Sequence, residues 1–155
     1  MTISLKTVQP EDEAALFGLF AAVRARELVM EGWTAALRDT ILRQQFDAQR
    51  RGYRAQHPDA REMLILVDGR PCGWAVLNSS AAAWHLLDVA IDVDRRREGI
   101  ATSVLRTWQS EAAAEGRAIA LSVLRTNGPA RALYDRLGFQ VMEESETHWR
   151  MEWRP

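Results

Sequence analysis

The sequence has one cysteine, one lysine and no long apolar run, and each shortage excludes a class of protein. Cys72 alone cannot form an intramolecular disulfide. It starts an apolar stretch, so we interpret it as a buried, inert thiol rather than a reactive one. Three histidines and this cysteine show no zinc-type spacing, so we expect no metal. No apolar run approaches the roughly 20 residues that span a bilayer, and the N-terminus lacks the apolar core of a signal peptide. We therefore expect a cytoplasmic protein without a membrane partner.

An excess of basic charge is also missing. The 20 basic and 21 acidic residues give a formal net charge of -1, whereas a nucleic-acid-binding domain usually shows a clear basic surplus. We therefore expect no nucleic-acid partner. The 155 residues, 47% of them hydrophobic, are enough for one domain, residues 1–155, with its own core.

The apolar periodicity predicts strands interleaved with helices. Pro10, followed by acidic residues, is typical of a helix start, and Asp68-Gly69 predicts a two-residue hairpin turn. Strands are expected at residues 2–8, 62–67, 72–78, 84–93, 118–124, 140–142 and 148–153. One helix is expected to start at residue 10, and three more are expected at 33–56, 102–114 and 129–137. Segment 84–93 has few polar residues and is expected to be central and covered on both faces. The order β-α-α-β-β-β-α-β-α-β-β indicates a mixed α/β sheet with helices packed on it.

A charged turn joins the strand at 84–93 to the next helix. The first turn of a helix leaves backbone N–H groups unpaired at the positive end of its dipole, which suits a phosphate. Gly99 would let an anion approach the backbone closely, and Arg96 and Arg97 add positive charge. The pattern alone is equally compatible with an ordinary helix N-terminus beside a solvated charge run.

Two motifs at the right separation resemble those of the GNAT superfamily of acyl-CoA-dependent N-acyltransferases. The first is [Arg/Gln]-x-x-Gly-x-[Gly/Ala], in which Arg96, Gly99 and Ala101 take the specified positions. The second is the block from Asn127 through Tyr134 to Leu-Gly-Phe at 137–139. The resemblance implies a mixed, mostly antiparallel sheet of six to seven strands with helices on both faces, its fourth and fifth strands splayed apart.

The resemblance also implies where acetyl-CoA, the co-substrate, would bind. The pantetheine arm would pair with the exposed edge of the fourth strand, and the pyrophosphate would meet the backbone N–H groups of the turn. The family usually has proline where Val93 stands, so the strand exit can differ here. The implied contact residues are Ile91, Val93, Arg96, Arg97, Gly99, Ile100, Ala101, Thr102 and Asn127. Asn127 fits equally well as a helix N-cap.

Tyr134 matches the family's tyrosine that faces the thioester sulfur. A phenol with a pKa of about 10 can donate a proton to the departing thiolate. The alternative is a tyrosine that only packs in the core. No cysteine lies in the motif block, so direct attack in a ternary complex is expected rather than an acyl-enzyme.

The general base is left open between two residues of the 84–93 strand. His85 matches a position that some family members use, and an imidazole pKa of about 6.5 suits the task. Its alternative is a solvent-facing histidine at a strand end. Asp88 interrupts an apolar stretch, so it must be paired, face the cleft or have a raised pKa. It could equally anchor the splayed strands.

The acceptor is an amine that the sequence does not identify: a small molecule, an amino acid or a peptide amine. In the family its specificity comes from the first two helices and the last strands, here residues 24–33 and 143–149. Glu27, Glu31 and Trp33 could face the amine, although a solvated helix end explains them as well. The helix at 33–56 is expected to serve only as cover. The alternative function is a non-catalytic acyl-CoA-binding or sensor module on the same fold. The oligomeric state is open, and the resemblance allows a homodimer because many relatives pair through their C-terminal strands.

Overall fold

The computed structural model describes residues 1–27 and 32–155. Its strands and helices follow the predicted order, with small differences at the ends of elements. They are β1 (Ile3–Thr7), η1 (Pro10–Asp12), α1 (Glu13–Glu27), α2 (Ala35–Gln56), β2 (Arg61–Val67), β3 (Arg70–Asn78), β4 (Trp84–Ile91), η2 (Val93–Arg95), α3 (Ile100–Ala114), β5 (Ile119–Leu124), α4 (Gly128–Arg136), β6 (Gln140–Glu144) and β7 (His148–Trp153).

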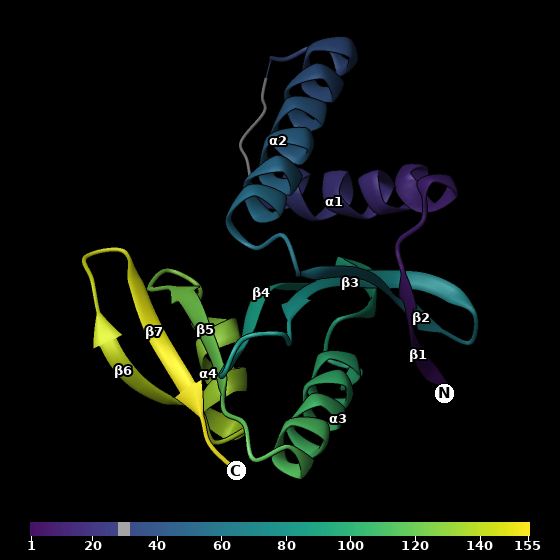
Figure 1. Ribbon diagram of the computed structural model, residues 1–155. Helices are drawn as coiled ribbons and strands as arrows, with labels where there is room; N and C mark the ends of the chain where they lie inside the picture. Colours follow the sequence, from purple (N-terminus) through teal and green to yellow (C-terminus); the bar gives the residue numbers. More distant parts are fainter. Residues whose placement is uncertain (28–31) are drawn as a thin grey trace.

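The strands form one seven-stranded sheet in the order β1-β2-β3-β4-β5-β7-β6 (Figure 1). Every neighbouring pair is antiparallel except β4 and β5, which are parallel. The predicted mixed, mostly antiparallel sheet is therefore confirmed. Strand β7 lies between β5 and β6, so the last hairpin adds to the sheet through its second strand.

Helices cover both faces of this sheet, as predicted (Figure 1). On one face α1 and α2 pack through Leu16, Phe20 and Phe46 against Leu64 and Trp74 of the sheet. On the other face, side chains of α3 and α4 join the larger core, which contains the buried residues Ile65, Leu77, Leu105, Trp108, Ile119 and Met151. The alternation of neighbours such as Leu64 and Ile65 between the two clusters follows from the two-residue period of a strand.

The sheet opens between β4 and β5. The two strands pair only over Trp84–Leu86 and Ile119–Leu121, so the rest of β4 has no partner on that side. The register with β3 also shifts here: Leu86 faces Leu77, Asp88 faces Val76, and Leu87 is the extra residue of a bulge. The splayed fourth and fifth strands are thus present, and they leave residues 87–90 partly exposed rather than covered on both faces.

The fourth strand ends two residues earlier than predicted. It stops at Ile91, and Val93 begins the 3-10 turn η2. The Asp92 side chain accepts a hydrogen bond from the Asp94 amide (3.1 Å), which caps this turn and draws the chain out of the sheet. Val93 therefore offers no strand edge, whereas Ile91 is the last residue of β4.

Candidate active site

The turn that joins β4 to α3 has the geometry of an anion site. Gly99 is the N-cap of α3 with φ 80, and Arg97 also has a positive φ of 66. No side chain caps this helix, and its first hydrogen bond runs from the Ser103 amide to the Gly99 carbonyl (3.0 Å). The amides of Ile100, Ala101 and Thr102 therefore precede the helix ladder, at its positive end. A Cβ built on Gly99 would have no protein atom within 4 Å, so the space over the turn is open.

Two arginines of the turn form different contacts. Arg95 forms a bidentate ion pair with Glu98 (2.9 and 3.1 Å). Arg96 donates through Nε to the carbonyl of Ile91 (3.3 Å), so its side chain ties the turn to the end of β4. An open hollow of about 610 Å³ starts at Gly99 and follows the exposed face of α3 past Thr102 and Ser103. The uncapped start of α3 and the open space over Gly99 thus leave room for an anion at the turn.

Tyr134 is the buried residue of α4, the helix that follows β5 in the chain. Its side chain is buried at 8% exposure and packs against Phe139, with ring centroids 5.6 Å apart. Burial, with a smaller contribution from the Asp88 carboxylate, raises the pKa of Tyr134 to about 12. The phenol therefore keeps its proton at neutral pH and is a hydrogen-bond donor.

Asn127 is the N-cap of α4. This is the structural one of the two roles that the sequence left open for it. Its side-chain oxygen accepts a hydrogen bond from the Ala130 amide (3.2 Å). This bond fixes the start of the helix that carries Tyr134.

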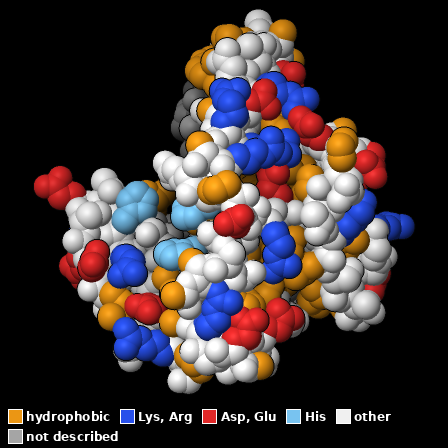
Figure 2. Space-filling model, viewed as in Figure 1, with side chains coloured by type: hydrophobic (Ala, Val, Ile, Leu, Met, Phe, Trp, Pro, Cys, Tyr) orange, Lys and Arg blue, Asp and Glu red, His pale blue; other side chains and the backbone are white. Residues whose placement is uncertain are grey.

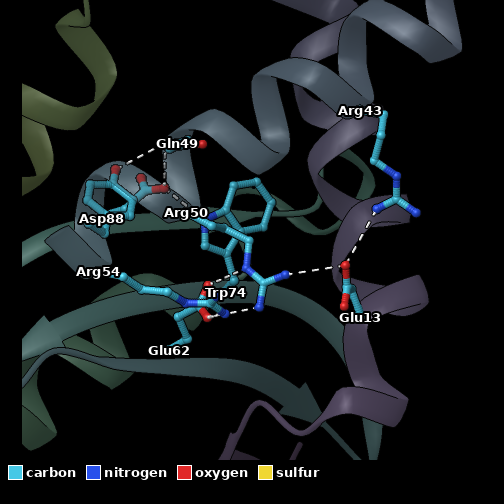
Figure 3. Close-up of polar contacts among 9 residues, drawn as sticks. Glu13, Arg43, Gln49, Arg50, Arg54, Glu62, Trp74 and Asp88 are labelled. Atoms are coloured by element: carbon cyan, nitrogen blue, oxygen red, sulfur yellow. Dashed lines mark hydrogen bonds and ion pairs between the residues drawn. The ribbon is translucent and has the colours of Figure 1, made fainter. Parts of the chain in front are cut away.

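Asp88 lies at the bulge in β4, on the face covered by α1 and α2 (Figure 3). Its Oδ2 accepts hydrogen bonds from Trp74 Nε1 (2.8 Å) and from Gln49 Nε2 (3.4 Å). Burial raises the pKa of Asp88, while the Trp74 hydrogen bond and the charge of Arg24 oppose that rise. The carboxyl therefore becomes a better proton acceptor than a solvated aspartate.

His85 lies in the part of β4 that still pairs with β5. Its ring centroid is 6.0 Å from that of His57, which follows α2, and Figure 2 shows the pale blue histidine side chains gathered in one region of this face. Burial lowers the pKa of His85, and the charges of His57 and Arg150 lower it further. A neutral imidazole at pH 7 could accept a proton, but His85 lies in the paired part of β4, whereas Asp88 lies beyond the last β4–β5 pair.

Comparisons with known proteins identify this arrangement. The family model described as "Acetyltransferase (GNAT) family" matches residues 22–139, which include the turn, Asp88 and Tyr134. The chain belongs to the GNAT acetyltransferase family. No curated protein sequence matches it.

Solved GNAT structures share the fold over nearly the whole chain. One is a PaiA N-acetyltransferase from Thermoplasma acidophilum in complex with coenzyme A, with a TM-score of 0.75, 18% identity and full coverage of both chains. Another is an acetyltransferase from Thermus thermophilus, with a TM-score of 0.72, 20% identity and coverage of 100% and 98%. A third is the ribosomal-protein-S18-alanine N-acetyltransferase from Escherichia coli, with a TM-score of 0.66, 16% identity and coverage of 99% and 94%.

Two polar residues of α2 in this GNAT protein, Gln49 and Tyr53, were not predicted from the sequence to lie near the site. Gln49 Nε2 donates to the Tyr53 hydroxyl (3.0 Å), and that hydroxyl donates to the carbonyl of Leu87 (3.5 Å). Burial, and secondly the Asp88 charge, raises the pKa of Tyr53 to about 12. The two residues continue the inward stripe of Leu42 and Phe46, so polar side chains on an apolar helix face were the available signal.

The residues expected to face the acceptor amine are less distinctive. Glu27 pairs with Arg24 on its own helix (3.0 Å), and Trp33 is 40% exposed. Glu31 lies outside the described residues. In the C-terminal hairpin, Trp149 lies beneath the Arg131 guanidinium, 4.3 Å from the ring centroid, so it is already stacked on a cation of the same chain.

Cys72 is buried, and burial raises the pKa of its thiol, which fits an inert residue of the core. Within residues 1–27 and 32–155, no His, Cys, Asp or Glu cluster is arranged to hold a metal ion. Across the same residues, no helix combines the length and apolarity needed to cross a membrane.

Proposed function

We propose that this GNAT protein transfers an acetyl group from acetyl-CoA to a primary amine by direct attack in a ternary complex. The observation that carries the proposal is the separation of β4 from β5 after Leu86, just before Asp88, whose charge also acts on Tyr134. A ligand entering this opening would have a proton acceptor and a proton donor near its reactive end.

The β4–α3 turn would hold the pyrophosphate of acetyl-CoA. Its support is the uncapped first turn of α3, with the amides of Ile100, Ala101 and Thr102, together with the open space over Gly99. The pantetheine arm would lie along the free edge of β4 near Ile91, as an added strand would. This path would be bordered by Arg96, Arg97 and Asn127. Arg96 would also hold the end of β4 in place through its hydrogen bond to the Ile91 carbonyl.

The chemistry would then divide between two side chains. The amine nitrogen attacks the thioester carbonyl carbon, which forms the C–N bond and breaks the C–S bond. Asp88 takes the proton that the nitrogen must lose, and Tyr134 donates its phenolic proton to the departing sulfur. Asp88 suits the first role because burial raises its pKa, and Tyr134 suits the second because its proton is retained at neutral pH. His85 is the second candidate for the base.

A non-catalytic acyl-CoA-binding module is the competing function. It would need the turn and the strand edge, but it would need neither a phenol nor a carboxyl with a perturbed pKa at the opening. Both groups are present here, and this favours the enzyme. Membership of an acetyltransferase family supports the same choice.

Two measurements test the proposal. Acetyl-CoA at about 100 times its Kd should stabilise the native state by about 2.7 kcal/mol, seen as a higher melting temperature. A screen of amines with detection of released thiol should then reveal turnover. Stabilisation by acetyl-CoA without turnover on any amine would favour the binding module, and no stabilisation by acetyl-CoA or CoA would contradict the site itself.

A further inference from the structure

The end of α4 is held by a side chain of α3. Gln109 donates a hydrogen bond through Nε2 to the carbonyl of Leu137, the C-cap residue of α4 (2.9 Å). The last carbonyls of a helix have no partner within the helix, and Leu137 is buried. Leaving a carbonyl unpaired in such a place is costly, so this hydrogen bond fixes where α4 ends.

The chain that follows this carbonyl folds back onto Tyr134. Gly138 has a left-handed backbone, with φ 88, and the Phe139 amide then donates to the carbonyl of Tyr134 (3.0 Å). The ring of Phe139 is also the one that packs against the Tyr134 ring. Residues 137–139 therefore form part of the surroundings of the phenol, and the hydrogen bond from Gln109 lies at their start.

Helix α4 is too short to fix the phenol by itself. It has nine residues, and a helix of that length is marginal without tertiary contacts. Its start is tied by the Asn127 cap and by Arg131, whose guanidinium lies over the Trp149 ring of β7 (4.3 Å). Its end is tied to α3 by Gln109. Tyr134 lies in the second half of α4, so its place depends most on the tie at the end.

The position of Gln109 on α3 makes its amide a specific link between two helices. It is half-buried and lies beside Leu105 and Trp108, which are buried in the larger core. An apolar side chain of similar size could fill this position, but it could not donate to the Leu137 carbonyl. The start of the same helix forms the proposed pyrophosphate site. The hydrogen bond thus joins the helix that would hold the cofactor to the helix that carries Tyr134.

We propose that Gln109 is a positioning residue, which places the Tyr134 phenol for proton donation to the departing sulfur. It acts through the Leu137 carbonyl and the turn at residues 137–139, not by touching the ligand. The inference rests on the proposed acetyltransferase function, in which Tyr134 is the general acid. It gives α3 a second task, because the helix whose start would bind the pyrophosphate also sets the place of the acid.

The first test follows the place of the phenol without using activity. The chain has two tyrosines, Tyr53 and Tyr134, so protein labelled with fluorotyrosine gives two fluorine NMR signals, which Tyr53→Phe assigns. Gln109→Leu removes the hydrogen-bond donor and keeps a side chain of similar size. It should shift the Tyr134 signal by more than its linewidth and leave the Tyr53 signal unchanged.

The matched control is Gly116→Ala, which perturbs the end of the same helix without contacting Leu137. Gly116 has φ 67, and a Cβ built there would have no protein atom within 4 Å. Both variants should lower the melting temperature, because one loses a hydrogen bond and the other strains a left-handed residue. Only Gln109→Leu should move the Tyr134 signal.

The second test asks whether the effect on catalysis passes through Tyr134. Gln109→Leu should lower kcat about tenfold, because a small misplacement of a catalytic group slows the reaction. The KM for acetyl-CoA should stay within about twofold of the wild type. In the Tyr134→Phe background, Gln109→Leu should have no further effect on kcat, whereas a general loss of structure would lower kcat in both backgrounds.

Three results would overturn the inference: an unmoved Tyr134 signal in Gln109→Leu, an equal movement in Gly116→Ala, or kcat losses that multiply in the double variant. Full activity of Tyr134→Phe would contradict the acid role in the proposed function and, with it, the catalytic role of Gln109. An unmoved signal beside a strongly impaired Tyr134→Phe would contradict this inference alone, so the two failures are distinct.

Discussion

Tyr134 and Asp88 show how burial prepares single residues for opposite tasks. A low-dielectric environment disfavours the charged form of each group, so the phenol holds its proton more firmly and the carboxylate attracts one more strongly. The same physical effect thus keeps the phenol protonated and makes the carboxylate a better proton acceptor.

Tyr134→Phe should lower kcat by about 100-fold or more, since general acid catalysis contributes at that scale. Phe keeps the ring that packs against Phe139, so the Kd for acetyl-CoA should change by no more than about twofold. Steady-state kinetics and calorimetry with acetyl-CoA give both values. If acyl transfer is the slow step and kcat is unchanged in Tyr134→Phe, Tyr134 is not the general acid.

Asp88→Asn should stabilise the protein at neutral pH while reducing its activity. Because the folded-state pKa is raised, the protonated carboxyl favours folding, and this contribution is lost as pH rises through that pKa. Asn resembles the protonated form and keeps an oxygen for the Trp74 and Gln49 hydrogen bonds. The melting temperature of the variant should exceed that of the wild type at neutral pH, and the difference should vanish below the ordinary aspartate pKa of about 3.9.

The pH dependence of kcat/KM identifies the base. Its acidic limb reports the free enzyme's essential base, so Asp88→Asn should lose that limb along with most of the activity. His85→Ala should keep it. If His85→Ala loses the limb and Asp88→Asn retains it, the imidazole is the base.

At the scale of elements, α3 has a glycine with a left-handed backbone at each of its ends. Gly99 and Gly116 both have positive φ values, 80 and 67, and a Cβ on either would have no protein atom within 4 Å. Alanine at either position should therefore carry a similar backbone cost of roughly 1–2 kcal/mol. Only Gly99 lies in the proposed pyrophosphate site.

Gly99→Ala and Gly116→Ala should therefore differ in ligand binding but not in stability. We expect similar falls in melting temperature, with a rise of about tenfold or more in the Kd for CoA in Gly99→Ala alone. Thermal denaturation and calorimetry measure the two effects separately. Equal CoA affinity in both variants would place the pyrophosphate elsewhere.

At the scale of the whole molecule, the Arg50–Glu62 pair joins the α1–α2 layer to the sheet. Arg50 belongs to α2 and Glu62 to β2, with side chains only 13% and 19% exposed, and Arg54 also reaches Glu62 (3.1 Å). Burial alone would raise the pKa of Glu62, but the hydrogen bonds and charges of Arg50 and Arg54 outweigh it and lower that pKa.

Glu62→Gln should destabilise the protein by about 1–3 kcal/mol at neutral pH, the cost of losing charged hydrogen bonds. Since the folded-state pKa is lowered, the wild-type advantage is present above the ordinary glutamate pKa of about 4.3 and lost as pH falls through the lowered value. Denaturant unfolding at several pH values measures it. The exposed Glu111→Gln is the control and should show no such advantage.

Much of this protein was predictable from its sequence because the decisive signals are local. Helix and strand periods, the Asp68-Gly69 turn, and the two motifs around Gly99 and Tyr134 each depend on residues close together in the chain. They were sufficient for the fold class, the family and the cofactor half of the proposed site.

Only the tertiary structure decided how distant segments meet. The bulge at Leu87, the early end of β4 before Val93, and the position of β7 between β5 and β6 depend on strand pairing. The meeting of Gln49 and Tyr53 with Asp88 depends on how α2 packs across the sheet. These are contacts between residues far apart in the chain, and no local pattern encodes them. The sequence by itself therefore determined the elements and the cofactor motifs, while tertiary packing decided which side chains surround Asp88.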